Sequence, residues 1–134
     1  MKVVIDANLF ISAFFWNGNP KKVIDRSSDK LDDLFMSMDI LDEIADVINR
    51  PKFKADRKET ENYISGIRKI ANFINSSEQV NLSRDKTDNK YIECAVAANA
   101  DYIISGDIHL LELKEYGGIK ILKAKEYLDI VTVD

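Results

Sequence analysis

Short apolar runs alternate with helical patterns along the whole of this 134-residue chain. The first run, KVVID at 2–6, has three consecutive apolar residues and is typical of a strand that is covered on both faces. Such strands belong in parallel sheets, where the helices that connect them cover the sheet. The alternation therefore predicts an α/β fold with a mostly parallel sheet.

Turn and capping residues divide the chain into the expected elements. Strands are expected at 2–6, 34–38, 78–83, 101–107 and 119–122. Helices are expected at 19–28, 39–53, from Arg57 to about Ile74, at 84–100 and at 124–131. Pro20 suits a first helical turn, Asp39 is a plausible cap, and Pro51 should end the helix that Asp39 begins.

Composition narrows the classes of protein that this chain could be. With 46% apolar residues it has the material for one well-packed domain over 1–134. Its single cysteine, Cys94, excludes an internal disulfide, and no apolar run approaches the roughly 20 residues that span a bilayer. We expect a cytoplasmic protein with no membrane contact. The net charge of −4 argues against a broad basic coat for nucleic acid.

Two aspartates stand where predicted strands end. Asp6 follows the first strand and Asp107 the fourth. In open α/β sheets, ligands bind at the carboxyl ends of the strands, where the strand order reverses. The two carboxylates would meet there if these strands are neighbours, although each alone could merely cap a turn or helix.

Two further acids lie on predicted helices. Glu43 is one turn from Ile40, at the edge of an apolar stripe, and Asp88 is one turn before Ile92. Alone, Glu43 is better explained as a solvated flank, and Asp88 equally well as a cap. Four carboxylates at one sheet edge would repel one another unless divalent cations neutralised them. Oxygen ligands select Mg²⁺ or Mn²⁺, and the chain has no Cys/His set for zinc.

Four segments carry a resemblance to a known family: VVIDANLFISA, ILDEIADVINRPKF, RDKTDNKYIECAVAANADYIISGD and YGGIKILKAKEYL. Nearly the whole chain resembles a PIN domain, specifically the branch of toxin components of toxin–antitoxin systems that is related to VapC-type toxins. The resemblance implies a three-layer α/β/α fold with a five-stranded parallel sheet in the order 3-2-1-4-5. It also implies a ribonuclease that depends on Mg²⁺ or Mn²⁺.

The resemblance also assigns roles to residues. The catalytic, metal-binding acids fall on Asp6, Glu43, Asp88 and Asp107. Asn8 and Ser105 are then expected to orient the carboxylates or the ligand by hydrogen bonds. Asp85 competes with Asp88 for the third position. We prefer Asp88, which lies within the helix register, and expect Asp85 to support it from outside.

Expected partners are an RNA substrate, a possible antitoxin protein and a second copy of the chain. A basic cluster after the Glu43 helix could hold RNA phosphates, or could equally be a solvated loop: Arg50, Lys52, Lys54, Arg57 and Lys58. The aromatic run at 14–16 could stack on bases, but a buried cluster or dimer contact is favoured. Together with Tyr63, Ile67 and Ile70, this run predicts a homodimer.

Other function classes fit less well. An aspartate-based phosphatase would need an acid at Asn8, and a phospho-receiver domain would need an acidic pair that is not evident. Two alternatives stay open. One is a PIN-like scaffold without activity, which the presence of all four acids disfavours. The other is an RNA-processing nuclease without an antitoxin.

Overall fold

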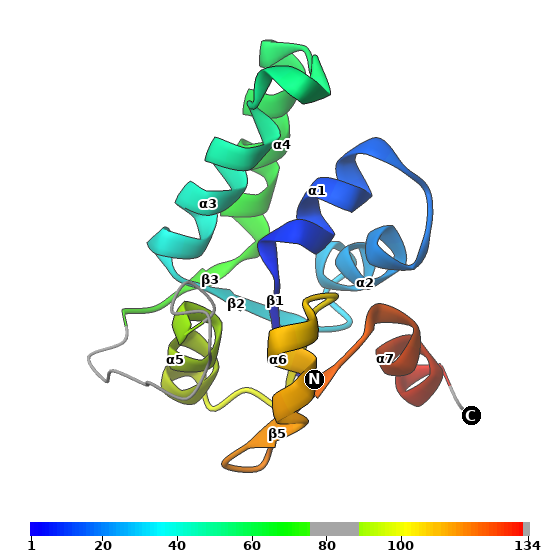
Figure 1. Cartoon of the computed structure of the whole chain (residues 1–134), viewed down its shortest axis with the longest axis vertical. Helices are drawn as coiled ribbons and strands as arrows, with labels where there is room; N and C mark the ends of the chain where they lie inside the picture. The colour runs from blue at the N-terminus through cyan, green and yellow to red at the C-terminus, as the bar shows by residue number, and fades with distance from the viewer. Residues whose placement is uncertain (76–88, 133–134) are drawn as a thin grey trace.

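The computed structural model describes residues 1–75 and 89–132. It has a central sheet with helices packed against it (Figure 1). The strands are β1 (Lys2–Ile5), β2 (Asp33–Met36), β3 (Asn72–Phe73), β4 (Tyr102–Ile104), β5 (Glu115–Tyr116) and β6 (Ile119–Leu122). The helices are α1 (Ala7–Phe15), α2 (Asn19–Ser28), α3 (Met38–Ile48), α4 (Arg57–Ile70), α5 (Asn89–Ala98), α6 (Ile108–Leu113) and α7 (Ala124–Val131), with a 3-10 turn η1 (Pro51–Phe53).

The sheet has the order β3-β2-β1-β4-β6-β5. β1 lies at its centre and pairs in parallel with both β2 and β4, so that Ile5 is opposite Ile104. Val3, Val4 and Ile5 are all buried, as expected for a strand covered on both faces. The predicted α/β fold is therefore confirmed. The predicted order 3-2-1-4-5 corresponds to β3-β2-β1-β4-β6, to which β5 adds one antiparallel edge strand.

Three of the described elements were not predicted from sequence: α1, α6 and β5. α1 begins directly after Asp6, whose side chain caps it by accepting from the Asn8 N–H. β5 is a two-residue strand that turns back into β6 through Gly117 and Gly118, both at positive φ. All three are short elements that periodicity alone does not separate from loops.

The end of α4 and the position of the third strand differ from the prediction. The helix ends at Ile70 instead of Ile74, because Ala71 is extended and Asn72–Phe73 pairs with β2. The Asn72 side chain also donates to the Leu34 carbonyl at 3.2 Å, which anchors this short strand. The strand predicted at 78–83 lies outside the described residues.

Capping of α3 also differs. Ser37, and not Asp39, is the N-cap, because its hydroxyl oxygen accepts from the Ile40 N–H at 3.3 Å. Asp39 lies instead in the first turn, where a negative charge suits the helix dipole. Glu43 is therefore carried on the second turn of a well-capped helix.

The apolar stripe of α4 packs against α1. Ile67 is buried, and the Tyr63 hydroxyl donates to the Phe10 carbonyl at 2.8 Å while its ring meets Phe14. Phe15 stacks on Phe53 with ring centroids 5.1 Å apart, which fits the buried-cluster interpretation of this run. The apolar side chains of this stripe are thus largely covered by other parts of the same chain. In the part of the chain that the structure describes, no helix is long and apolar enough to cross a membrane.

Candidate functional site

Asp6 lies where the central strand ends, and only 2% of it is exposed. One carboxylate oxygen accepts from the Asn8 N–H at 3.0 Å, and the other accepts from the Ser105 hydroxyl at 2.6 Å. Burial raises the pKa of Asp6 above its ordinary value, while these two hydrogen bonds oppose the rise. The fold therefore keeps a carboxylate in a place that is costly for its charge.

Ser105 connects Asp6 to Asp107 across neighbouring strands. Its hydroxyl donates to Asp6 and accepts from the Asp107 N–H at 2.9 Å. This is possible because β1 and β4 pair side by side and both end at the same edge. Asp107 is half-buried and caps α6, with its Oδ1 accepting from the His109 N–H at 2.7 Å. Its carboxylate thus has a structural partner, as the capping interpretation predicted.

Glu43 reaches the same region from α3 and is held by two residues of α5. Its Oε1 lies 2.7 Å from the Lys90 ammonium and accepts a hydrogen bond from the Tyr91 hydroxyl. The same hydroxyl accepts from the Ala7 N–H at 3.2 Å. Tyr91 therefore ties Glu43 to the junction of β1 and α1, next to Asp6.

Electrostatic interactions connect Asp6, Glu43 and Tyr91. The charge of Glu43 contributes to the raised pKa of Asp6, after burial as the main cause. Burial first, and then the charges of Asp6 and Glu43, raise the pKa of Tyr91 far above its ordinary value. Tyr91 is therefore a neutral hydrogen-bond donor at any physiological pH.

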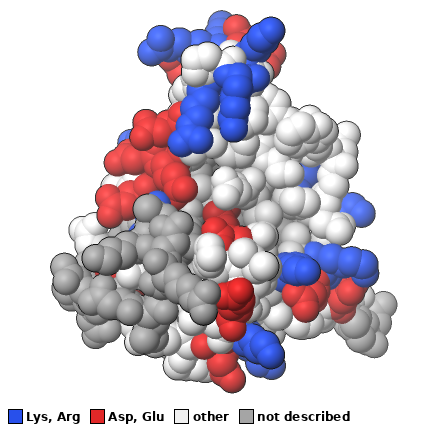
Figure 2. Space-filling view, in the orientation of Figure 1, with Lys and Arg blue, Asp and Glu red and all other residues white. Residues whose placement is uncertain are grey.

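The surface around the site is mixed in charge. Figure 2 shows acidic side chains gathered along α3, a small acidic area in the middle of the face, and basic side chains above them at the η1 end. A shallow hollow along α3 is lined by Asp39, Asp42, Glu43, Asp46, Val47, Arg50 and Lys90. This hollow places Arg50, one member of the predicted RNA-binding cluster, on the same concave surface as Glu43.

The donor chemistry suits a hard cation, but the described residues do not complete a metal site. Asp6, Glu43 and Asp107 offer only carboxylate oxygens, the ligands that Mg²⁺ and Mn²⁺ prefer. Within 1–75 and 89–132, however, no three acidic, histidine or cysteine residues are grouped closely enough to hold a metal ion. Asp88 and Asp85, which the sequence analysis added to the site, lie outside the described residues.

Comparison with known proteins places this arrangement in a family. The family model described as PIN domain matches residues 2–109. The chain belongs to the PIN domain family. A relative from Methanocaldococcus jannaschii, the uncharacterized protein MJ1680, is 33% identical over 119 residues, which cover 86% of this chain and 76% of the relative.

A solved structure shares the fold of this PIN domain. It is a chain from the crystal structure of VapBC2 from Rickettsia felis, bound to a DNA fragment from their promoter. The match has a TM-score of 0.61 and covers 90% of this chain and 97% of the other, at 13% identity. The predicted PIN-domain membership and fold are therefore confirmed.

Of the seven residues predicted at or beside the site, the structure describes five, and it brings four of them together: Asp6, Glu43, Ser105 and Asp107. Asn8 takes part through its backbone N–H, whereas the residue itself is exposed. The predicted basic cluster lies on η1 and at the ends of α3 and α4, and all five of its residues are exposed.

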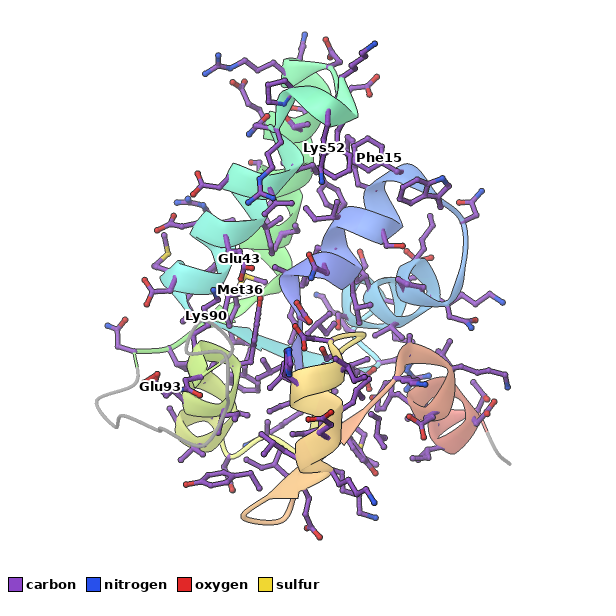
Figure 3. All side chains as sticks on the ribbon, viewed as in Figure 1. Phe15, Met36, Glu43, Lys52, Lys90 and Glu93 are labelled. Carbon is purple, nitrogen blue, oxygen red and sulfur yellow. The ribbon has the colours of Figure 1, made fainter. Side chains whose placement is uncertain are left out.

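Sequence analysis missed Lys90 and Tyr91. Figure 3 shows Lys90 on α5 beside Glu43 on α3. Tyr91 is 1% exposed, and a buried tyrosine hydroxyl needs a polar partner, so its place on the inner face of the α5 pattern was a usable signal. Lys90 gave no such signal, because its partner belongs to another helix far away in sequence.

Proposed function

We propose that this PIN domain is a metal-dependent endoribonuclease and the toxin of a toxin–antitoxin pair. The observation that carries the proposal is the buried Asp6 carboxylate, held by Ser105 and electrostatically coupled to Glu43 at the end of the central strands. A buried acid with a perturbed pKa beside a second acid is typical of a functional site. Membership in the PIN family and the structural likeness to a chain of VapBC2 support it.

The proposed site comprises Asp6, Glu43, Asp88 and Asp107 as carboxylate ligands of Mg²⁺ or Mn²⁺. The bound ion would lower the pKa of a water nucleophile and neutralise charge on the phosphate. Ser105 fixes the orientation of Asp6, and the Asn8 N–H holds its other oxygen. Asp85 would support Asp88 from outside the ligand set. Tyr91 fixes Glu43 relative to β1, so that the acids keep their spacing.

The proposed RNA path follows the hollow along α3. Arg50 lines this hollow with Glu43, and Lys52, Lys54, Arg57 and Lys58 continue the positive charge beyond it. Exposed cations next to a hydrolytic site would hold the phosphates that flank the scissile bond. This local cluster answers the objection that the whole chain carries a net negative charge.

The proposed assembly contains an antitoxin and a second copy of this chain, in the cytoplasm. The matched chain comes from a structure of VapBC2 bound to a DNA fragment from their promoter, and an antitoxin partner is proposed for this chain by that likeness. The apolar surface that could form a homodimer is smaller than the sequence suggested, because Ile67 is buried and Tyr63 packs against α1 of the same chain. Trp16, which is 63% exposed, is the apolar side chain of that group left at the surface.

The activity is tested by incubating purified protein with single-stranded and structured RNA in Mg²⁺ or Mn²⁺, and with chelator. We expect cleavage that stops with chelator and is lost in Asp6→Asn and Asp107→Asn. Asp129→Asn is the matched control, because Asp129 is an exposed acid on α7 whose only role in the described part is an ion pair with Lys125. Cleavage without metal that survives both site substitutions would refute the proposal.

A further inference from the structure

The ion pair between Lys90 and Glu43 joins α5 to α3 at the edge of the proposed site. The Lys90 ammonium is 2.7 Å from Glu43 Oε1, and the two side chains are only 20% and 29% exposed. The other lysine ion pairs of the described residues join side chains that are 45% exposed or more. An ammonium that has lost this much water needs an anion next to it. Lys90 is therefore held at the site by charge.

A second contact fixes the position of the ammonium. Lys90 Nζ lies 5.4 Å from the centroid of the Tyr91 ring, within the range of a cation–π interaction. Tyr91 also donates its hydroxyl to Glu43 Oε1. Two donors thus fill the two lone pairs of that oxygen. The cation and the hydroxyl have separate roles, because the neutral hydroxyl orients Glu43 and the ammonium balances its charge.

Repulsion between Glu43 and Asp6 is the reason why a cation beside Glu43 matters. The charge of Glu43 acts on Asp6, which is buried and carries no ion pair among the described residues. Without a cation nearby, the two carboxylates would repel each other across a partly desolvated region. A divalent cation would remove this repulsion, but a lysine ammonium at Glu43 removes part of it with no metal bound.

We infer that Lys90 is a built-in counter-ion of the site: it neutralises Glu43 while no divalent cation is bound, and it weakens divalent-cation binding through its positive charge. This inference rests on the proposed function, because it takes Glu43 as a ligand. Tyr91 keeps Glu43 in place in both states, whereas Lys90 gives up its contact when the divalent cation arrives. Lys90 thus sets the metal affinity through its charge on Glu43, and it is not itself a ligand.

Two other roles for Lys90 make different predictions. If Lys90 served to hold Glu43 in the orientation that binds metal, its removal would weaken metal binding. If the pair served only to join α3 to α5, its removal would lower the melting temperature equally with and without metal. Only a counter-ion predicts that the metal-free protein is destabilised and that metal binds more tightly.

The test compares wild type with Lys90→Met, which keeps most of the aliphatic stem but removes the charge, and Lys90→Arg, which keeps the charge. Lys125→Met is the control, since it removes an exposed ion pair on α7. Mn²⁺ affinity is measured by calorimetry at constant ionic strength, and thermal melts are recorded in chelator and in saturating Mn²⁺. Circular dichroism establishes that each variant is folded.

In Lys90→Met we expect the Kd for Mn²⁺ to fall roughly tenfold, from the loss of one repelling charge at a partly exposed site. Lys90→Arg should stay near the wild-type Kd, and Lys125→Met should not change it. Lys90→Met should melt below wild type in chelator, and Mn²⁺ should narrow or reverse this difference. If Lys90→Met fails to fold, Lys90→Gln is measured in its place.

Each other outcome rejects a specific statement. If wild type binds Mn²⁺ and Lys90→Met binds it equally or less tightly, the counter-ion role is wrong and the proposed metal site stands. If wild type binds no Mn²⁺ at the concentrations tested, the proposed metal site is wrong, and the counter-ion role is rejected with it.

Discussion

Removing the Tyr91 hydroxyl should destabilise the fold more than an ordinary lost hydrogen bond does. In Tyr91→Phe, the Ala7 N–H, in a residue that is fully buried, loses its side-chain acceptor, and Glu43 loses a donor. An unsatisfied buried N–H costs about 1–3 kcal/mol. The bond to the carboxylate adds about 1 kcal/mol, less than its full value because Lys90 still contacts Glu43 and the pair is partly exposed.

The expected loss is therefore about 3 kcal/mol in the free energy of unfolding. For a chain of this length, that corresponds to a fall of roughly 10 °C in the melting temperature. Urea denaturation in chelator measures the free energy of unfolding directly. An unchanged m-value would show that the substitution has not altered the compactness of the folded or unfolded state. A double-mutant cycle with Glu43→Gln separates the Glu43 contact from the Ala7 contact.

Tyr63→Phe is the matched comparison. Its hydroxyl donates once, to the Phe10 carbonyl, so its removal should cost only about 1 kcal/mol. If Tyr91→Phe costs no more than Tyr63→Phe, or shows no coupling with Glu43→Gln, the hydroxyl does not connect α3 to β1 in the way described.

Two further predictions concern Asp107 and Cys94. Asp107→Asn should melt at or above wild type in chelator and below wild type in saturating Mn²⁺. The amide still caps α6, but it repels the other acids of the site less and binds metal less well. Equal shifts in the two buffers would show that Asp107 does not belong to the site. Burial raises the pKa of the Cys94 thiol to about 12 from 9.0, so the folded state keeps the proton and stability falls as pH rises through this range. Relative to Cys94→Ala, wild type should lose about 1 kcal/mol between pH 8.5 and 10 in urea titrations, and pH-independent differences would show that the thiol reaches water.

Four of the six described strands, β1, β2, β4 and β6, and most of the described helices could be predicted from sequence because their burial follows simple patterns. The run from Val3 to Ile5 is apolar without interruption, and it became the buried centre of the sheet. The prediction failed where tertiary pairing overrides periodicity. Ile74 continued the α4 stripe at helical spacing, yet Asn72 and Phe73 form a strand beside β2 instead of another helical turn.

The acids of the candidate site were predictable in part, because strand ends are places where topology concentrates ligands. Asp6 and Ser105 lie at such ends, and their hydrogen bond joins the two central strands. The residues that hold Glu43 were not predictable in the same way. Their contacts join two helices, and only the packing of α5 against α3 decides that Lys90 and Tyr91 meet that carboxylate.

The central position of β1 determines when the site can form during protein synthesis (Figure 1). Ser105, the hydrogen-bond partner of Asp6, is made 99 residues after it. Until β4 has left the ribosome, β1 has a free edge and the Asp6 carboxylate lacks that partner. Forming such a distant pair also costs loop-closure entropy, which slows folding. Nascent chains stalled before Ser105 should therefore be protease-sensitive and lack the Asp6–Ser105 contact of the candidate site.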